Sequence, residues 1–414
     1  MITTINNEHK ELNFSSEREQ SQACLNSAEH EKNQGRKVLN VPNLRFPEFQ
    51  GEWKKTKFGD IATGFDYGMN AAAKNYDGVN KYIRITDIDE ASSTYTDKDI
   101  VSPDGILTDN YLLNNRDILL ARTGASTGKS YLYKKSDGKL YYAGFLIRAN
   151  VTTHDPYFVF SQLHTHRYWR WVSIMSARSG QPGINSQEYS SFPIYTTSID
   201  EESKIAKLLS LLDERIATQN KIIEDLKKLK YAISKKLLCN DKWTTYKIQD
   251  IAEIGRGRVI SSIEIDRQKH PLYPVYSSQT SNDGIMGYLD NYMFDGEYIT
   301  WTTDGANAGT VFYRKGKFNC TNVCGTLKIQ PKFDCYFVSL VLQQATQKYV
   351  SSNLANPKLM NNTMASIKIR MPNIETQKQL SKVFQALDGC LFIHQRTCEM
   401  YLKEKQYLLR QMFI

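Results

Sequence analysis

The chain has 414 residues, a formal net charge of +9 and an apolar fraction of 41%. This length accommodates two or three domains with cores of their own, and the composition is that of an ordinary globular protein. No apolar run approaches the ~20 residues of a membrane span, and the polar amino-terminus lacks the apolar stretch of a signal peptide. The seven cysteines are odd in number and widely spread, which fits reduced thiols, so we expect a cytoplasmic protein.

The charge is distributed unevenly along the chain. Residues 1–40 and 41–202 each contribute −1, whereas residues 203–238 contribute +5, 239–373 contribute +4 and 374–414 contribute +2. A basic excess suggests a polyanionic partner, although lysine-rich helix surfaces also serve solubility. Residues 1–40 are polar and poor in large apolar side chains, so we predict a disordered or loosely helical tail there.

The stretch ARTGASTGKSYLY, residues 121–133, has the composition of a phosphate-binding loop but the wrong spacing. A phosphate-binding loop needs four residues between its glycines, whereas Gly124 and Gly128 enclose three. The residues that follow alternate polar and aromatic like a strand, where a phosphate-binding loop would open a helix. We therefore predict a tight turn at the end of a β-hairpin, where the glycines supply backbone freedom.

Residues 203–238 carry apolar side chains at alternating steps of four and three, the pattern of a coiled-coil seam. The apolar positions are Ile205, Leu209, Leu212, Ile216, Ile223, Leu226, Ile233 and Leu237, interrupted by Gln219 and Lys230. Adding 175 to each number gives a second seam of Leu380, Phe384, Leu387, Leu391, Cys398, Tyr401, Leu408 and Met412, interrupted by His394 and Lys405. Two unrelated amphipathic helices would rarely agree so closely, so the two segments indicate an internal repeat.

The two seams are expected to bury each other. A lone helix of this length would leave several large apolar side chains in water, each worth ~1.5–3 kcal/mol on burial. The matching polar layers would lower the stability of the pair while restricting its register. At 1.5 Å per residue each seam is ~50 Å long, which would make a rigid spacer. The alternative is that each helix packs on its own globular domain.

The segments between the helices repeat as well. GEWKKTKFGDIATG (51–64) is echoed by DKWTTYKIQDIAEIG (241–255), and the glycine turn by TWTTDGANAGTVFY (300–313). PYFVFSQL (156–163) matches CYFVSLVL (335–342) as a helix start, and the late loop GQPGINSQEYSSFPI (180–194) lies opposite ANPKLMNNTMASIKI (355–369). In the second copy Thr310 and Val311 replace Lys129 and Ser130, which no phosphate-binding loop could tolerate. The pattern predicts an α+β chain in which two strand-rich domains alternate with two long helices.

The candidate catalytic and metal-binding motifs in the sequence each lack a required residue or spacing. Asp155-Pro156-Tyr157 is typical of the base-holding loop of amino-methyltransferases, but the second proline and a glycine-rich cofactor loop are missing, which favours a structural turn. Glu48 and Glu52 stand too close for separate strands to bring them to one Mg²⁺. The close pairs Cys320/Cys324 and Cys390/Cys398 lack further ligands at zinc spacing. We predict no catalytic and no metal-binding residue.

Polar and aromatic side chains suited to nucleic acid are enriched in corresponding loops of both copies. Arg, Lys, Asn and Gln read base edges, while Arg, Lys and hydroxyl groups hold phosphates. In the first copy the candidates are Lys74, Tyr76, Arg122, Lys129, Arg178, Gln181, Asn185 and Gln187. In the second copy they are Arg256, Arg258, Gln279, Asn282, Asn307, Asn353, Asn356, Lys358, Asn361 and Asn362. Each residue taken alone fits a solvated loop better than a base contact, and it is the enrichment of the same regions in both copies that supports DNA binding.

The doubled layout resembles the specificity (S) subunit of type I restriction-modification enzymes. The resemblance covers residues 41–414 and is carried by the opening VPNLRFPEFQGEWKKTKFGDIA, the turn RTGASTGK and the helix segments LLSLLDERI and VFQALDGCL. The Pro-x-x-Glu entry to the helix is present at residues 372–375, whereas Thr197 replaces the proline in the first copy. The expected domains are a tail (1–40), recognition domain 1 (41–202), a central helix (203–240), recognition domain 2 (241–373) and a carboxy-terminal helix (374–414).

The resemblance implies a non-catalytic chain whose two target recognition domains each read one half of a split DNA site. It implies that the two helices pair antiparallel, with an internal pseudo-twofold repeat. Two modification subunits would dock on the helices and bring S-adenosylmethionine and adenine methylation, and two motor-nuclease subunits would bring ATP, Mg²⁺ and cleavage. The chain itself would bind no cofactor. Two alternatives remain: a coiled-coil scaffold that binds only proteins, and nucleotide hydrolysis at residues 124–130.

Overall fold

The computed structural model describes residues 39–177, 181–238, 240–351 and 356–414. The chain folds into two compact units, and the division between them falls inside both long helices. The N-terminal unit contains the described residues up to Asn220 together with Arg396–Ile414, and the C-terminal unit contains those of Lys221–Gln395. Residues 1–38 of the predicted tail lie outside the described residues. Within the described parts of the chain, no helix is long and apolar enough to span a membrane.

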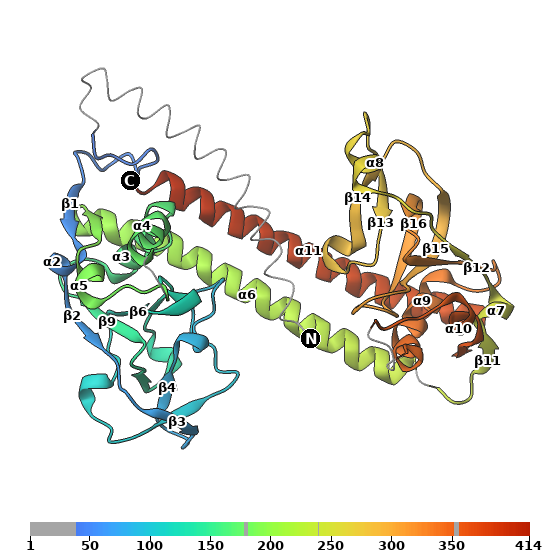
Figure 1. The fold of residues 1–414 in the computed structure, drawn as a ribbon, viewed down its shortest axis with the longest axis horizontal. Coiled ribbons are helices and arrows are strands. Elements are labelled where there is room, and N and C mark those ends of the chain that lie inside the picture. Colours follow the sequence, from blue (N-terminus) through green and yellow to red (C-terminus); the bar gives the residue numbers. More distant parts are fainter. Residues whose placement is uncertain (1–38, 178–180, 239, 352–355) are drawn as a thin grey trace. The chain divides into compact units, whose positions relative to one another are not determined.

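The N-terminal unit is built on a four-stranded antiparallel sheet of order β2-β9-β6-β7 (Figure 1). Its strands are β2 (Ala62–Tyr67), β6 (Asp117–Ala121), β7 (Ser130–Leu132) and β9 (Leu146–Val151). Three two-stranded sheets pair β1 (Lys54–Lys57) with β10 (Pro193–Thr196), β3 (Ala72–Asn75) with β5 (Val101–Asp104), and β4 (Lys81–Ile83) with β8 (Leu140–Tyr142). The helices are α2 (Phe58–Ile61), α3 (Pro156–Gln162), α4 (His166–Ser176) and α5 (Ser186–Ser190), with short 3₁₀ turns η2 (Ile85–Asp87), η3 (Asp109–Tyr111), η4 (Gly124–Ser126) and η5 (Lys135–Asp137).

The C-terminal unit repeats this plan with a larger sheet of order β12-β17-β15-β16-β13-β14. Its strands are β12 (Ala252–Arg256), β13 (Tyr273–Tyr276), β14 (Ile285–Leu289), β15 (Phe294–Thr302), β16 (Val311–Cys320) and β17 (Cys324–Ile329), and a separate pair joins β11 (Thr244–Lys247) to β18 (Lys368–Met371). The helices are α7 (Ile248–Ile251), α8 (Ser262–Asp266), α9 (Cys335–Ala345) and α10 (Asn361–Ser366), with η6 (Ser281–Gly284) and η7 (Thr346–Tyr349). β13 pairs parallel with the end of β16, as β4 pairs parallel with β8, and β14 extends the sheet antiparallel to β13.

Strand registers establish the repeat residue by residue. In the N-terminal unit Tyr67 of β2 pairs with Ile147 of β9, and in the C-terminal unit Arg256 of β12 pairs with Gly325 of β17. Helices α3 and α9 begin at matching places and are capped alike, because Asp155 and Asp334 each accept a hydrogen bond from a backbone N–H of the first turn. Asp155-Pro156-Tyr157 is therefore a helix start. The predicted α+β fold class with an internal repeat is confirmed.

Two helices of nearly equal length end the two copies: α6 (Ile199–Leu237) and α11 (Ile374–Gln411). Each follows a polar capping residue. The side chain of Ser198 accepts from the N–H of Glu201 at 3.4 Å, and that of Asn373 accepts from the N–H of Thr376 at 2.9 Å. Helix α6 thus begins four residues before the predicted boundary at 203, because Ser198 caps it and acidic residues fill its first turn.

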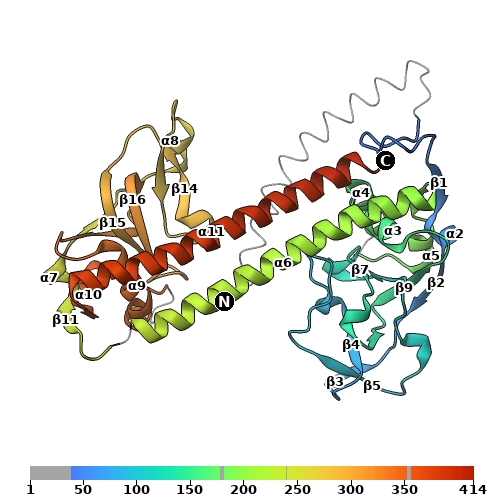
Figure 2. The same ribbon diagram turned by 180° about the vertical axis from the view of Figure 1, so that it is seen from behind.

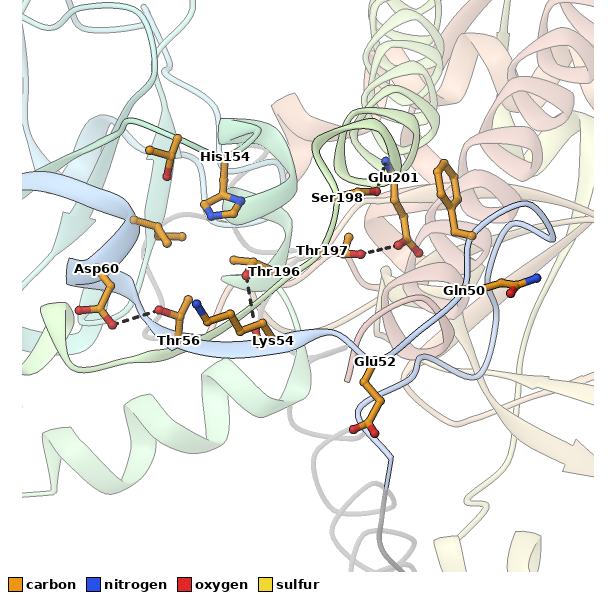
Figure 3. A pocket seen from close by; sticks show the side chains of 13 residues that line it. Gln50, Glu52, Lys54, Thr56, Asp60, His154, Thr196, Thr197, Ser198 and Glu201 are labelled. Atoms are coloured by element: carbon orange, nitrogen blue, oxygen red, sulfur yellow. Dashed lines mark hydrogen bonds between the residues drawn. The ribbon is translucent and has the colours of Figure 1, made fainter.

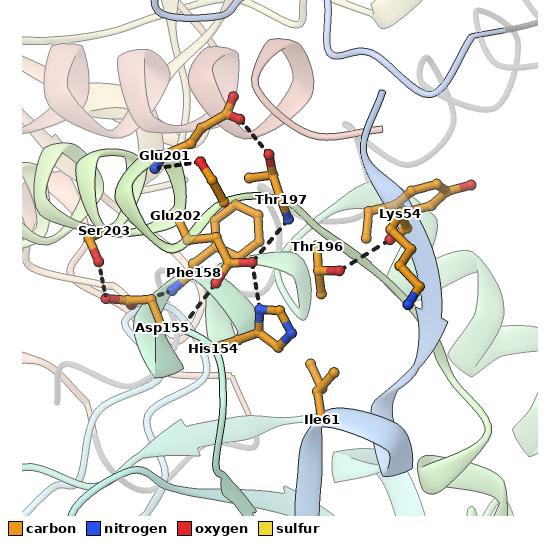
Figure 4. A network of polar contacts seen from close by, with 12 residues as sticks. Lys54, Ile61, His154, Asp155, Phe158, Thr196, Thr197, Glu201, Glu202 and Ser203 are labelled. Carbon is orange, nitrogen blue, oxygen red and sulfur yellow. Dashed lines mark hydrogen bonds and ion pairs between the residues drawn. The ribbon is translucent and has the colours of Figure 1, made fainter. Parts of the chain in front are cut away.

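Buried acids follow the cap of α6. Glu202 accepts hydrogen bonds from the backbone N–H groups of Asp155 (3.0 Å) and Thr197 (3.1 Å), and its Oε1 lies 2.9 Å from His154 Nδ1 (Figure 4). Burial raises the pKa of Glu202 despite these partners. The matching residue of α11 is the neutral Gln377, whose Oε1 accepts from the N–H of Asp334 at 3.0 Å. Both units tie the long helix to the start of α3 or α9, one with a carboxylate and the other with an amide.

The long helices pair antiparallel inside each unit (Figures 1 and 2). In the N-terminal unit Lys405 Nζ lies 2.6 Å from Asp213 Oδ1, and the thiol of Cys398 donates to Asn220 Oδ1 at 3.4 Å. Seven residues forward on α6 thus correspond to seven residues back on α11. Lys230 and Asp388 form the corresponding ion pair in the C-terminal unit. Mutual packing of the two helices, predicted from the heptads, is confirmed.

Burial along the seams follows the heptads except at one end of α6. The buried positions are Ile205, Leu209, Leu212, Ile216, Phe384, Cys398, Leu408 and Met412, and the half-buried positions are Ile223, Leu226, Ile233, Leu380, Leu387, Leu391 and Tyr401. Leu237 is 37% exposed, so its assignment to the seam is corrected, and its neighbour Leu238 is buried in the core instead. A straight helix has 3.6 residues per turn, so a strict 3.5-residue repeat drifts off the buried face with length.

The polar lysine layers of the seams are fully partnered. Asp213 binds Lys405 and also accepts from the hydroxyl of Tyr157 in α3. Asp388 binds Lys230 and accepts from the hydroxyl of Tyr336 in α9 at 2.5 Å. Each Tyr-Asp-Lys layer therefore joins one long helix to the other and to the helix of the adjoining domain.

The carboxy-terminal end of α11 completes the core of the N-terminal unit. The backbone N–H of Leu44 donates to the carbonyl of Gln411 at 2.8 Å. The ring of Phe413 lies 6.1 Å from that of Trp53 and 5.3 Å from that of Phe158, centroid to centroid. Trp53 is 1% exposed and donates through Nε1 to Glu201 at 3.4 Å. Residues from both ends of the chain thus share one apolar cluster.

Removing one aspartate from a Tyr-Asp-Lys layer should destabilise its unit. Asp213→Ala leaves Lys405 and the Tyr157 hydroxyl without their shared acceptor, and hydrogen bonds to charged groups contribute about 1.5–3 kcal/mol each. We expect a loss of that size in the free energy of unfolding, measured by urea denaturation. The control is Lys228→Ala, whose exposed pair with Glu224 should contribute under about 0.5 kcal/mol. Equal effects of the two substitutions would contradict a structural role for the layer.

A buried histidine should make the N-terminal unit sensitive to acid. Nδ1 of His164 lies 2.9 Å from the Phe160 carbonyl and must donate to it, so Nε2 accepts from the Ser93 hydroxyl at 2.9 Å. Burial, followed by the nearby Lys405 charge, lowers the pKa of His164 to about 4. The unfolded chain therefore binds this proton first, and stability falls as the pH drops below about 6.5.

Between pH 7 and pH 5 we expect the titration of His164 to lower the free energy of unfolding by up to about 2 kcal/mol. Urea denaturation at both pH values would measure it. His164→Gln removes the titrating group, so the variant should show a correspondingly smaller difference between the two pH values. An unchanged pH dependence in the variant would show that His164 does not titrate as the fold requires.

Candidate nucleic-acid interface

The glycine turns close β-hairpins in both units. β6 pairs antiparallel with β7 and β15 with β16, and the turns between them place glycine at positive φ. The φ angles are 69° at Gly124, 93° at Gly128, 93° at Gly305 and 83° at Gly309. No long helix follows either turn, so the phosphate-loop alternative is wrong and the predicted hairpin is confirmed.

The late loop of each copy is hydrogen-bonded to the turn. In the N-terminal unit Gly124 N–H donates to the Pro182 carbonyl at 2.9 Å, and Ile184 N–H donates to the Arg122 carbonyl at 2.9 Å. The C-terminal unit repeats both bonds, from Gly305 to Pro357 at 3.0 Å and from Leu359 to Thr303 at 2.9 Å. We call these paired segments the turn–loop edge, comprising 122–129 with 181–187 and 303–310 with 356–362.

The turn–loop edge gathers more than half of the predicted DNA-binding residues. They are Arg122, Lys129, Gln181, Asn185 and Gln187 in the N-terminal unit, and Asn307, Asn356, Lys358, Asn361 and Asn362 in the C-terminal unit. Arg256 at the end of β12 adjoins the second edge, because its Nη2 lies 3.8 Å from Met360 Sδ. Arg178 and Asn353 lie outside the described residues.

Several edge residues also have intramolecular partners. Lys129 pairs with Glu90 at 3.4 Å and Lys358 with Asp304 at 3.6 Å. The Asn185 side chain accepts from the N–H of Glu188 at 2.9 Å and caps α5. These contacts hold the edge in shape, and a DNA contact by the same residues stays a prediction.

The remaining candidates lie on other elements. Lys74 is on β3, paired with Asp104 at 3.8 Å, and Tyr76 follows that strand. Arg258 binds Glu264 through both terminal nitrogens, Gln279 donates to the carbonyl of Ile285, and Asn282 has a φ of 46° within η6. The structure therefore does not gather these five residues with the turn–loop edges.

Two exposed aromatic residues beside the first edge escaped the sequence analysis. Tyr67 is 42% exposed and its ring lies 4.7 Å from the guanidinium of Arg122. Phe145 is 57% exposed, and its carbonyl accepts from the Arg122 N–H at 3.1 Å. Only the order β2-β9-β6 brings these residues together, so no local sequence pattern could have revealed them.

A cavity of about 590 Å³ lies elsewhere in the N-terminal unit, beside the start of α6 (Figure 3). Its walls include the carboxylates Glu52, Asp60 and Glu201, with Lys54 and His154 near them. The wall carries mixed charge, because Glu201 is ion-paired with Arg45 at 2.7 Å and the cations lie among the carboxylates. Within the described ranges, no three His, Cys, Asp or Glu side chains gather in a way that could hold a metal ion.

Comparison with known proteins identifies the family. The profile described as "Type I restriction modification DNA specificity domain" matches the chain twice, over residues 50–228 and 240–399. The chain belongs to this family. Specificity subunits are non-catalytic components of type I restriction-modification complexes, so the resemblance noted in the sequence is confirmed.

Relatives of this specificity subunit occur in Mycoplasma pneumoniae. It is 36% identical over 219 residues to a protein named there as type I specificity subunit S.MpnORF201P, covering 49% of this chain and 91% of that protein. It is 39% identical over 178 residues to the specificity subunit of the type I restriction enzyme MpnII, covering 42% and 53%. The crystal structure of the S subunit from M. genitalium has the same fold, with a TM-score of 0.67 at 16% identity over 90% of this chain and 99% of that one.

A methyl group at Gly128 should disturb the turn–loop edge of the specificity subunit. A Cβ built there would lie 2.8 Å from Val172 Cγ1 and 3.0 Å from the Trp169 ring, in addition to the strain of positive φ. Gly51 has a similar φ of 83° with nothing within 4 Å of a Cβ, so Gly51→Ala isolates the backbone strain. We expect Gly128→Ala to lower the free energy of unfolding by about 1–3 kcal/mol more than Gly51→Ala, measured by urea denaturation. Equal losses of unfolding free energy in the two variants would show that α4 accommodates the methyl group at no energetic cost.

Proposed function

We propose that this specificity subunit reads a bipartite DNA target, with one half-site for each unit. The observation that carries the proposal is the duplicated turn–loop edge, built from equivalent hydrogen bonds on equivalent strands. The amide and guanidinium side chains along both edges are the groups that read base edges in the major groove. Two such edges in one chain fit two half-sites better than one continuous site.

The outer faces of the paired helices fit protein partners. In the N-terminal unit Met400 and Tyr407, which lie about two turns apart on one face of α11, are 68% and 58% exposed. In the C-terminal unit Tyr231 of α6 is 71% exposed. Exposed apolar side chains of this kind are available to a protein partner. In our proposal two modification subunits dock on these faces and bring S-adenosylmethionine for adenine methylation. Two restriction subunits join through them and bring ATP and Mg²⁺, while this chain binds no cofactor.

Exchange of one recognition domain tests the proposal. Residues 41–202 would be replaced by the corresponding segment of a relative, and the chimera expressed with its modification subunits. Sequencing of methylated adenines should show one half-site changed and the other kept. A change in both half-sites, or a single continuous motif in the parent, would contradict one reader per unit.

Salt dependence separates a DNA reader from a protein-only scaffold. A chain that neutralises phosphates releases counterions, so the logarithm of its affinity for random duplex should fall linearly with that of the salt concentration. Gel-shift titrations between about 50 and 200 mM salt, without and with modification subunits, would measure the slope. A flat response in both cases is the result expected of a scaffold.

A further inference from the structure

Arg122 projects from the N-terminal turn–loop edge without a counter-charge. Its guanidinium lies 4.7 Å from the Tyr67 ring, its Nε is buried without a hydrogen-bond partner, and it forms no ion pair with a carboxylate of the described residues. The Tyr67 hydroxyl accepts in turn from the N–H of Ser186 at 3.3 Å, which fixes the ring against the start of α5. The guanidinium is therefore held in one orientation by an aromatic face.

Arg256 lies beside the turn–loop edge of the C-terminal unit but comes from a different strand. The strand register places Arg256 at the position that Tyr67 holds in the N-terminal unit. Tyr67 is the last paired residue of β2 and lies opposite Ile147, and Arg256 is the last paired residue of β12 and lies opposite Gly325. The residue equivalent to Arg122 is Thr303, whose N–H donates to Val323 just as that of Arg122 donates to Phe145. Tyr67 therefore corresponds to Arg256, and Arg122 corresponds to Thr303. The arginine follows β6 in the N-terminal unit but ends β12, the counterpart of β2, in the C-terminal unit.

Arg256 is also without a counter-charge. Its Nε is buried without a partner, its Nη2 lies 3.8 Å from Met360 Sδ, and no described carboxylate pairs with it. Asn361 stands beside it, with Nδ2 3.4 Å from the Gly255 carbonyl and Oδ1 buried without a partner. Of the described arginines with a buried and unpartnered Nε, only Arg167 is elsewhere, and its terminal nitrogens bond Pro193 and Gln162.

An unpaired buried polar group is costly, and its presence in a folded protein calls for a functional reason. A phosphate can be held by any cation, including a flexible lysine. A guanidinium held in one orientation additionally suits a base edge, because the O6 and N7 atoms of guanine accept two parallel bonds from an arginine fork. Exposed Phe145, whose carbonyl accepts from the Arg122 N–H, adds an apolar face for a neighbouring base.

Resting on the proposed function, we propose that Arg122 and Arg256 are the guanine readers of the two half-sites. Each directs its two terminal nitrogens at O6 and N7 of one guanine in the major groove. Arg122 follows β6 and Arg256 ends β12, strands that flank β9 or β17 on opposite sides, so each unit presents one such fork beside its central strand. The assignment therefore predicts a guanine in each half-site.

The test uses the complex of this chain with its modification subunits. The parent complex first defines the bipartite motif by sequencing of methylated adenines. Binding of duplexes that carry each base at each motif position is then measured by fluorescence anisotropy for Arg122→Ala, Arg122→Gln and Arg256→Ala. The controls are Lys55→Ala and Arg370→Ala, exposed cations on β1 and β18 that remove the same charge from the same units.

We expect Arg122→Ala and Arg256→Ala each to lose about 5- to 150-fold of discrimination at one G·C pair, in different half-sites. The controls should leave base preferences unchanged, and the untouched half-site serves as an internal standard for folding. If Arg122→Ala abolishes its whole half-site, Arg122→Gln decides, because glutamine keeps the stem on Tyr67 and favours adenine over guanine.

A half-site without guanine, an unchanged guanine preference in Arg122→Gln, or uniform weakening across all duplexes would overturn the assignment. These results would leave the bipartite reading intact. A parent complex that yields no split motif would instead overturn the proposed function, so the two failures are distinguishable.

Discussion

The Tyr-Asp-Lys layers are the interaction on which the rest of the fold depends. Apolar seams specify that two helices meet, but they tolerate sliding by whole heptads. Asp213 with Lys405, and Asp388 with Lys230, are satisfied in one register only, because a slipped pair would leave charged groups without partners. The hydroxyls of Tyr157 and Tyr336 extend the same constraint to α3 and α9. Helix register and domain docking are thereby set by one side chain in each unit.

The duplicated plan conserves geometry more strictly than chemistry. Glu202 and Gln377 accept the same backbone hydrogen bond at the helix entry, although one carries a titratable group and the other does not. Arg122 follows β6, whereas Arg256 ends β12, the counterpart of β2, so the two units carry the guanidinium on strands that flank β9 or β17 on opposite sides. Positions that carry backbone contacts are therefore constrained, while the side chains projecting from them are free to vary.

The sequence predicted the features that depend on periodicity and local chemistry. Heptads revealed the paired helices, the offset of 175 revealed the repeat, and the glycine spacing of residues 121–133 revealed the hairpin. It failed where packing decides. Leu237 continues the heptad by arithmetic but turns outward, because the helix drifts and ends there. The contact of Tyr67 with Arg122 joins residues on different strands, and neither carries a local mark of it. The aspartates in the lysine layers lie outside the seam positions and read as ordinary surface charges.

The shared cluster of Trp53, Phe158 and Phe413 has a consequence for how the molecule is made. Domains commonly acquire structure one after another as they leave the ribosome. The strands of the N-terminal unit lack part of their core until residues 396–413 have been translated, so this unit is completed only after α11 has left the ribosome. A chain that stops within α11 would lack Phe413 and leave the N-terminal unit without part of its core.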